Sequence, residues 1–266
     1  MDDNQFRQLL KRFGLAWDGY RKVRKGVKKR LCRHMHQLGC RNVQAYFWAL
    51  DESKETRQDC ERLMTVSISR FFRDRHLWQY LEKEILPSII REQRKRMRVW
   101  SAGCALGEEV YSFKILWHTI VGCKGPLAEL EMVATDMNPG YLRRARAGIY
   151  PPSSLKEVPE RWQDLYFKRK QGQRYGIADH LKKGIVWQVG NVLSDSPGID
   201  FQVIFLRNSL LTYYLEEIKA PAFQNVINSL AQDGFLIIGA HEKIPVGARG
   251  LLTSRGHPCV FQKEAP

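Results

Sequence analysis

The chain has 266 residues, 44% of them hydrophobic, which is enough for one large domain or two modest ones with a substantial core. No apolar run approaches the length of about 18 residues that indicates a membrane-spanning helix. The acidic, polar start at residues 1–5 also argues against a signal peptide, so we expect a cytoplasmic protein without membrane insertion. The formal net charge of +15 indicates an acidic partner: nucleic acid, anionic lipid or an acidic protein surface.

The cysteine and histidine positions give no metal-site pattern. The six cysteines include no Cys-x-x-Cys pair, which favours reduced thiols over a disulfide framework or a zinc site. His34 and His36 flank Met35 on opposite sides of a predicted helix, so they are poorly placed to share a metal ion. We therefore predict no metal centre.

Residues 1–87 are predicted to form a small all-helical N-terminal domain. Apolar residues with helical spacing over 6–13 stop at Gly14, and further helices are expected from 43 to 50 and from 78 to Pro87. Between them, a basic helix is predicted, with its basic residues at 21–33. It carries an apolar stripe along one face, and Gly39 is expected to end it. We expect the stripe to face the core and the basic face to meet an acidic partner, although a merely solvated face is the alternative. The stripe consists of Val23, Val27, Leu31 and Met35.

From residue 98 the sequence changes to alternating strands and helices, after a polar, basic stretch at 88–97 that we interpret as a linker. Strands are predicted at 98–102, 131–135, 185–189, 201–206 and 234–239, with a weaker one at 258–262, and helices at 108–121, 139–147 and 216–231. This alternation predicts the α/β class, with a parallel-rich sheet covered by helices on both faces over 98–266. A proline-rich, basic stretch at 149–184 interrupts it as an insertion or small subdomain.

The segment from Arg98 to Ser112 is the most informative in the chain. It combines a buried strand, a glycine turn from Gly103 to Gly107, and a helix that begins with two acids. This arrangement lets a backbone approach a nucleotide-like cofactor closely. The GxxxG spacing differs from both the dinucleotide and the P-loop motifs, and no Lys-Ser/Thr follows. An acid at the end of the next strand, Asp136, is placed to accept hydrogen bonds from ribose hydroxyls. S-adenosylmethionine, with its ribose, ammonium and sulfonium groups, suits such a site.

A co-linear set of motifs resembles the CheR-type chemotaxis receptor methyltransferases, which use S-adenosylmethionine to methylate glutamate carboxylates. Ser67–Asp74 (SISRFFRD) resembles the family's Asn-x-Thr-x-Phe-Phe-Arg-Asp/Glu, and Val99–Ser112 resembles its cofactor loop. The remaining matches are Ala134–Asp136, Ala145–Tyr150, Asn191–Leu193, Phe201–Tyr213, and Gly234–Gly239 with Glu242. The resemblance spans roughly residues 1–262. It implies a Rossmann-like S-adenosylmethionine methyltransferase domain preceded by a helical domain.

The resemblance also implies site residues. Glu108 and Asp136 would hold the polar groups of the cofactor, with Asp136 on the ribose. Met137 is a further cofactor-binding candidate, and Gly103 and Gly107 lie at the close approach of the turn. Asn191 and Val192 would contact the adenine. Ser67, Ser69 and Arg73 would reach the site from the N-terminal side. Arg207 and Asn208 would lie beside the methionine part and the acceptor, so that Arg73, Arg207 and Asn208 are the candidate catalytic residues. A chemoreceptor signalling helix would bind the basic helix at 21–33.

The sequence departs from the family motifs at a few positions. Ser67 and Ser69 stand where the family has Asn and Thr, and Leu206 stands where it has Cys. Thr212 occupies the position of the family's tyrosine, with Tyr213 and Tyr214 following. Because this position should lie beside the acceptor, the change bears on the identity of the acceptor more than on cofactor binding.

The chemistry needs no general base if the acceptor is a carboxylate, since a glutamate with an ordinary pKa of about 4.3 is already ionised at neutral pH. Alignment and removal of water from the nucleophile would then provide the catalysis. Two alternatives remain open at this point. The same scaffold could methylate nucleic acid or another acceptor, with strongly salt-dependent affinity for polynucleotides. It could also be a non-catalytic module that binds S-adenosylmethionine.

Overall fold

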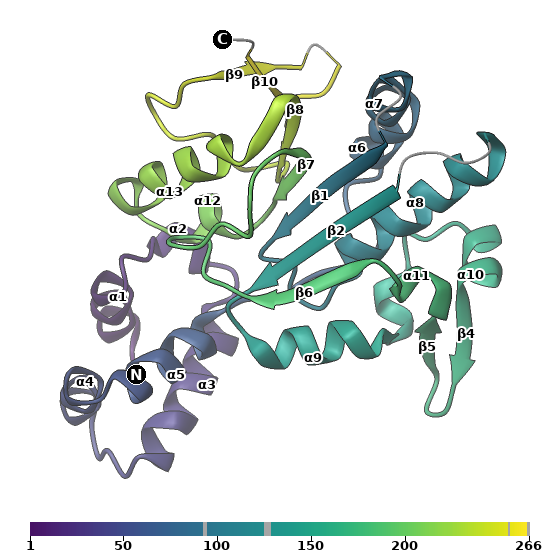
Figure 1. Ribbon diagram of the computed structural model, residues 1–266. Helices are drawn as coiled ribbons and strands as arrows, with labels where there is room; N and C mark the ends of the chain where they lie inside the picture. The colour runs from purple at the N-terminus through teal and green to yellow at the C-terminus, as the bar shows by residue number, and fades with distance from the viewer. Residues whose placement is uncertain (93–94, 125–128, 255, 265–266) are drawn as a thin grey trace.

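A computed structural model describes residues 1–92, 95–124, 129–254 and 256–264. The centre of this part is a seven-stranded sheet with the order β6-β2-β1-β7-β8-β10-β9 (Figure 1). The neighbours β6, β2, β1, β7 and β8 pair in parallel. Strand β10 runs antiparallel to both β8 and β9. The strands are β1 Arg96–Ala102, β2 Glu129–Asp136, β6 Ile185–Val189, β7 Phe201–Leu206, β8 Leu230–Ile238, β9 Leu251–Thr253 and β10 Val260–Lys263. The predicted α/β, Rossmann-like class is confirmed.

Helices cover both faces of the sheet, as Figure 1 shows for α8 (Glu108–Lys124) and α13 (Glu216–Asn228). Successive residues of a strand point to opposite faces. In β1, Val99 therefore packs into the core on the α8 side, whereas Trp100 packs into the core on the α13 side. Every residue of β7 is buried. Central parallel strands that are covered twice have no polar face, which explains their continuous apolar runs.

The five helices at the N-terminus form a core of their own. They are α1 Asp3–Arg12, α2 Trp17–Tyr20, α3 Arg24–Gln37, α4 Val43–Glu52 and α5 Lys54–Met64. Along α3 the predicted apolar stripe is buried at Val27, Leu31 and Met35. This domain is joined to the loop after β7 by two backbone hydrogen bonds: the N–H of Ala16 donates to the carbonyl of Tyr213 at 2.7 Å, and the N–H of Leu215 donates to the carbonyl of Gly14 at 2.9 Å.

The next helices, α6 (Arg75–Tyr80), η1 (Leu81–Ile85) and α7 (Leu86–Arg91), pack on the sheet and not on the N-terminal helices. Trp78 of α6, for example, stacks on Phe205 of β7 with the ring centroids 5.7 Å apart. The sequence placed this stretch in a helical domain that ends at 87, because helical spacing reveals a buried face but not the core that buries it. We therefore propose a domain boundary near residue 66. Helix α7 and strand β1 occupy most of the predicted linker at 88–97.

The insertion at 149–184 contains a small antiparallel sheet with the order β3-β5-β4. Its elements are β3 Ile149–Tyr150, η2 Pro152–Leu155, α10 Glu160–Tyr166, β4 Phe167–Lys170, β5 Arg174–Ile177 and α11 Asp179–Lys182. It follows α9 (Pro139–Ala147) and precedes β6. In the described part of the chain, every helix is too short or too polar to cross a membrane.

Candidate active site

The turn after β1 lies against the end of β2. Gly103 has a φ of 79°, a conformation that favours glycine, and its N–H donates to the carbonyl of Thr135 at 2.9 Å. A Cβ added at Gly103 would lie 2.9 Å from the Cβ of Ser209, which is closer than real side chains come. The bare backbone of this turn therefore forms one wall of a cavity at the carboxyl ends of the parallel strands, the usual ligand-binding edge of such sheets.

Asp136, the last residue of β2, is 8% exposed and is held by two backbone groups. Its Oδ2 accepts from the N–H of Ala105 at 2.9 Å, and its Oδ1 accepts from the N–H of Asn138 at 2.8 Å. Burial raises the pKa of this carboxyl, while the two N–H donors act in the opposite direction. Each oxygen retains a free lone pair. The carboxylate is thus fixed in orientation and still able to accept hydrogen bonds from a diol.

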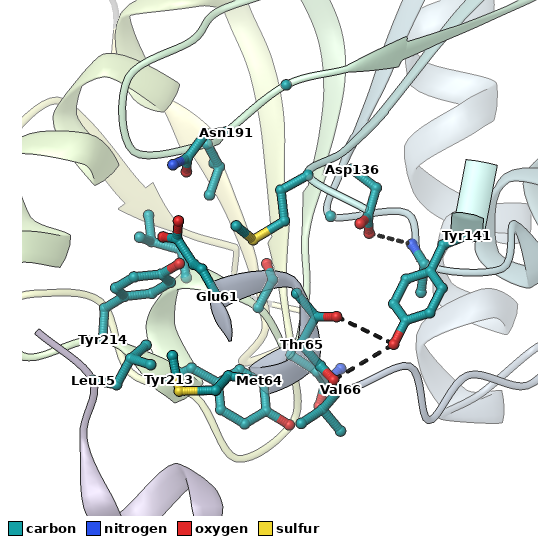
Figure 2. A pocket seen from close by; sticks show the side chains of 18 of the residues that line it. Leu15, Glu61, Met64, Thr65, Val66, Asp136, Tyr141, Asn191, Tyr213 and Tyr214 are labelled. Atoms are coloured by element: carbon teal, nitrogen blue, oxygen red, sulfur yellow. Dashed lines mark hydrogen bonds between the residues drawn. The ribbon is translucent and has the colours of Figure 1, made fainter. Parts of the chain in front are cut away.

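A cavity of about 740 Å³ opens beside Asp136 (Figure 2). Six of the predicted site residues line it: Gly103, Asp136, Met137, Asn191, Val192 and Asn208. The structure therefore brings together residues from the ends of β1, β2, β6 and β7.

The remaining lining includes residues that sequence reasoning did not single out. The N-terminal domain contributes Leu15, Tyr20, Glu61 and Thr65, and α9 contributes Tyr141, whose hydroxyl hydrogen-bonds with the Thr65 hydroxyl at 3.2 Å (Figure 2). Tyr213 and Tyr214 complete the wall after β7. No local sequence signal marks these positions, because the distant segments meet only through the contact between the two domains.

A second cavity of about 440 Å³ adjoins the first, and both are lined by Val66, Gly103, Ala105 and Asn208. Of the predicted residues, Ser69, Arg73 and Arg207 line this second cavity. Glu109, which the sequence analysis did not assign to the site, lines it as well. The two cavities thus form one site with a larger chamber and a smaller, charged one.

The segment that carries Arg73 is anchored on both sides. The ring of Phe71 packs edge-on against Tyr150 and Phe167 of the insertion, at 4.8 and 4.9 Å between centroids. The backbone N–H of Phe72 donates to the hydroxyl of Ser112 in α8 at 2.9 Å. Phe72 also has a positive φ of 52°, which is uncommon for a bulky residue. These contacts place Arg73 at the smaller chamber, whereas Ser67 lines neither cavity.

Arg207 is nearly buried, with 3% of its side chain exposed, and it pairs with two carboxylates. Its Nη1 donates to Oε2 of Glu109 at 3.1 Å, and its Nη2 donates to Asp74. Burial raises the pKa of Glu109, and Arg207 opposes that rise. Within the described residues its buried Nε has no partner. We propose that Arg207, which pairs with these two acids, mainly holds the chamber wall in place.

Gly107 and Glu108 lie behind the cavities and line neither. A Cβ at Gly107 would meet Ala145 at 2.9 Å and Trp187 at 3.0 Å, so this glycine allows α8 to pack closely on α9 and β6. Glu108 is 1% exposed and accepts a hydrogen bond from the hydroxyl of Ser154 at 3.2 Å. The cofactor contacts predicted for both residues stay a prediction; from their places in the structure we propose that they support the wall of the site.

Glu242 organises the loop after β7. Its Oε2 accepts from the N–H groups of Asn208 and Gly239, at 2.8 and 2.7 Å, and its Oε1 accepts from the Thr212 hydroxyl at 2.5 Å. Asn208 has a φ of 54° and needs such support. Thr212 lines neither cavity, because its hydroxyl is used in this contact. In this chain the position of the family's tyrosine therefore has a structural role.

Comparison with known proteins agrees with this geometry. Residues 67–258 match the family model described as "CheR methyltransferase, SAM binding domain". The chain belongs to the CheR methyltransferase family. The CheR match covers the glycine turn, Asp136, the insertion and the loop after β7. The chain is therefore an S-adenosylmethionine-dependent methyltransferase of the CheR type, as the sequence predicted.

Proteins named as chemotaxis protein methyltransferases are similar to this chain. A chemotaxis protein methyltransferase from Listeria innocua is 36% identical over 182 residues, which cover 68% of this chain and 67% of that protein. A probable chemotaxis protein methyltransferase from Rhizobium etli is 29% identical over 240 residues, covering 86% and 88%. Among solved structures, the S-adenosylmethionine-bound amino pentose methyltransferase CalS10 from Micromonospora echinaspora matches with a TM-score of 0.35 and 14% identity, over 60% of this chain and 50% of that one.

The residues of the larger chamber fit the cofactor. A fixed carboxylate at Asp136 suits ribose hydroxyls, and the bare turn at Gly103 leaves room for close approach. After the neighbouring strand β6, the Oδ1 of Asn191 accepts from the N–H of Leu193 at 3.0 Å, and within the described residues its amide N–H groups have no partner. The cofactor, when bound, supplies a methyl group on a sulfonium that is open to in-line attack.

Proposed function

We propose that this chain transfers the methyl group to glutamate carboxylates of an acidic, helical protein, as a chemotaxis receptor would present them. The observation that carries this proposal is the smaller chamber, which adjoins the cofactor chamber and is bordered by the Arg73 guanidinium. Within the described residues Arg73 forms no ion pair, and its Nη1 donates only to the carbonyl of Ile68 at 3.1 Å. It retains donors for an acceptor carboxylate.

Arg73 would orient the acceptor without holding it tightly, because the guanidinium is half-exposed and its charge is screened by water. The carboxylate attacks as the ionised form that it already has at neutral pH, so no proton has to be removed. Asn208, fixed by Glu242 at the junction of the two cavities, would hold the methionine part in line with the acceptor. The contribution of the protein is then alignment and exclusion of water.

The decisive assay is methyl transfer from radiolabelled S-adenosylmethionine to a purified cytoplasmic fragment of a chemoreceptor. We expect label on glutamate side chains as esters that mild alkali hydrolyses to methanol. A fragment whose methylated glutamates are replaced by glutamine is the control and should take up no label. Label that resists alkali, or label on RNA but not on the receptor fragment, would contradict the proposed acceptor.

We also propose that helix α3 presents the binding face for this partner. Three of its basic residues are not available: Arg24 and Lys28 pair with Asp3, and Arg30 donates to the carbonyls of Leu63 and Thr65. The exposed cations Lys25, Lys29 and Arg33 are spaced four residues apart and therefore share one face of the helix. Since Thr65 lines the larger chamber, Arg30 ties this helix directly to the edge of the site.

Reversing the charge on this face is expected to weaken the encounter with an acidic acceptor. The triple variant Lys25→Glu, Lys29→Glu, Arg33→Glu should raise KM for the receptor fragment about tenfold or more at low salt, with kcat unchanged. The difference should shrink as salt screens the charges. Lys83→Glu, an exposed cation on η1, is the control and should leave KM unchanged. Equal KM values for the triple variant and the wild type would show that α3 does not bind the acceptor protein.

A further inference from the structure

Glu61 places a carboxylate at the wall of the larger chamber from the last turn of α5. Within the described residues this carboxylate accepts no hydrogen bond and forms no ion pair. Burial raises its pKa, although Arg57 and Arg62 lower it. Because Glu61 is only half-buried, its carboxylate stays open to the chamber and available to a donor on a ligand. Glu61 is therefore an acceptor that lacks a donor in the protein itself.

Asn191 and Val192 offer donors to the same chamber. The Oδ1 of Asn191 is engaged by the N–H of Leu193, which leaves the Asn191 amide N–H groups. The backbone N–H of Asn191 is also engaged, by Asp195 at 2.8 Å, whereas the N–H of Val192 has no partner within the described residues. These donors suit the ring nitrogens of an adenine, which are acceptors.

One polar group of an adenine, the exocyclic 6-amino group, cannot pair with these donors. This group is itself a donor, and it needs an acceptor on the protein when it is buried. In Figure 2 the carboxylate of Glu61 lies near the Tyr214 ring and below Asn191 in the view, on the side of the chamber away from Asp136. Adenosine that rests its ribose on Asp136 and its base on Asn191 would thus extend toward Glu61.

We propose that Glu61 accepts a hydrogen bond from the 6-amino group of the adenine and so selects adenosine over 6-oxo cofactors. The inference rests on the proposed placement of the cofactor in the larger chamber. It assigns to the N-terminal helical domain a direct part in cofactor specificity, in addition to any part in binding the acceptor protein. The bound cofactor would then add a contact between α5 and the methyltransferase domain.

The test compares S-adenosylhomocysteine with S-inosylhomocysteine, in which a carbonyl oxygen replaces the 6-amino group, by calorimetric titration of the full chain. The wild type should prefer the adenosine compound about tenfold or more, because the 6-oxo group faces a carboxylate and leaves it unpaired. In Glu61→Gln the preference should fall at least about fivefold, since an amide both accepts and donates. Glu55→Gln changes an exposed acid on the same helix and should keep the preference of the wild type.

The outcomes separate this inference from the proposed site. Binding of S-adenosylhomocysteine by the wild type, with the same preference in the wild type and Glu61→Gln, would overturn the role of Glu61 and leave the cofactor site standing. Failure of the wild type to bind S-adenosylhomocysteine would overturn the site and this inference together. Thermal unfolding without ligand shows whether each variant is folded, and the isosteric change to Gln keeps the packing of α5.

Discussion

Replacing Asp136 by alanine is expected to weaken binding of S-adenosylhomocysteine tenfold or more, as measured by calorimetric titration beside the wild type. The carboxylate would accept two ribose hydroxyls, and hydrogen bonds to a charged group contribute about 1.5–3 kcal/mol each. A tenfold loss corresponds to about 1.4 kcal/mol, which is a conservative expectation. The variant also loses the acceptors for the N–H groups of Ala105 and Asn138, so the turn itself would loosen.

Two controls separate loss of ligand contacts from loss of structure. Thermal unfolding of Asp136→Ala without ligand reports the change in the folded state alone. Asp164→Ala removes an exposed carboxylate from α10 in the insertion and should leave the affinity unchanged. If Asp136→Ala bound S-adenosylhomocysteine as tightly as the wild type does, Asp136 would not hold the ribose.

Replacing Arg207 by methionine is expected to lower the free energy of unfolding by about 3–5 kcal/mol at neutral pH, as measured by urea denaturation. Removing one partner of a buried ion pair leaves the other charge buried without compensation. Here Glu109, with 15% of its side chain exposed, would lose its cation, and Asp74 would lose its partner as well. An exposed pair should behave differently. Arg12→Met breaks the ion pair between Arg12 and Asp51, whose side chains are 35% and 52% exposed, respectively. This change should lower the free energy of unfolding by about 0–1 kcal/mol.

The pH dependence of the Arg207→Met variant has a defined sign. Burial already raises the pKa of Glu109, and without Arg207 that pKa rises further in the folded state. The folded protein then binds a proton more tightly than the unfolded chain does, so the stability of the variant falls as the pH rises. The deficit relative to the wild type should therefore shrink at acid pH. Adding Glu109→Gln should recover part of the loss at neutral pH. A loss no larger than that of Arg12→Met would show that the pair is not effectively buried.

The parts of the fold that were predictable from sequence are those with local causes. The predicted ranges of β6 and β7 match the structure, and β1 begins two residues earlier than predicted. Strand β7 is buried along its whole length and is a nearly continuous apolar run, as expected of a central parallel strand. The hairpin of β4 and β5 was missed because half of its strand residues are basic and exposed and its strands are only four residues long. The sequence predicts a domain boundary at residue 87 and we propose one near residue 66; the two differ because helical periodicity does not tell which core buries a helix.

The same distinction holds within the site. Gly103 and Asp136 were predictable because their roles follow from the turn and the strand end that carry them. Glu61 and Tyr214 were not, because they reach the chamber only through the contact between the N-terminal domain and the loop after β7. Glu109 was passed over in favour of its neighbour Glu108. One step along a helix rotates a side chain by about 100°, and only the packing of α8 decides which acid faces the chamber.

The most direct test of the account is a crystal structure of the chain with S-adenosylhomocysteine. We expect adenosine in the larger chamber, with the ribose on Asp136, the base between Asn191 and Glu61, and the sulfur directed toward Asn208 and the smaller chamber that Arg73 borders. Adenosine bound elsewhere, or in the larger chamber with the sulfur directed away from Arg73, would contradict the proposed arrangement of cofactor and acceptor.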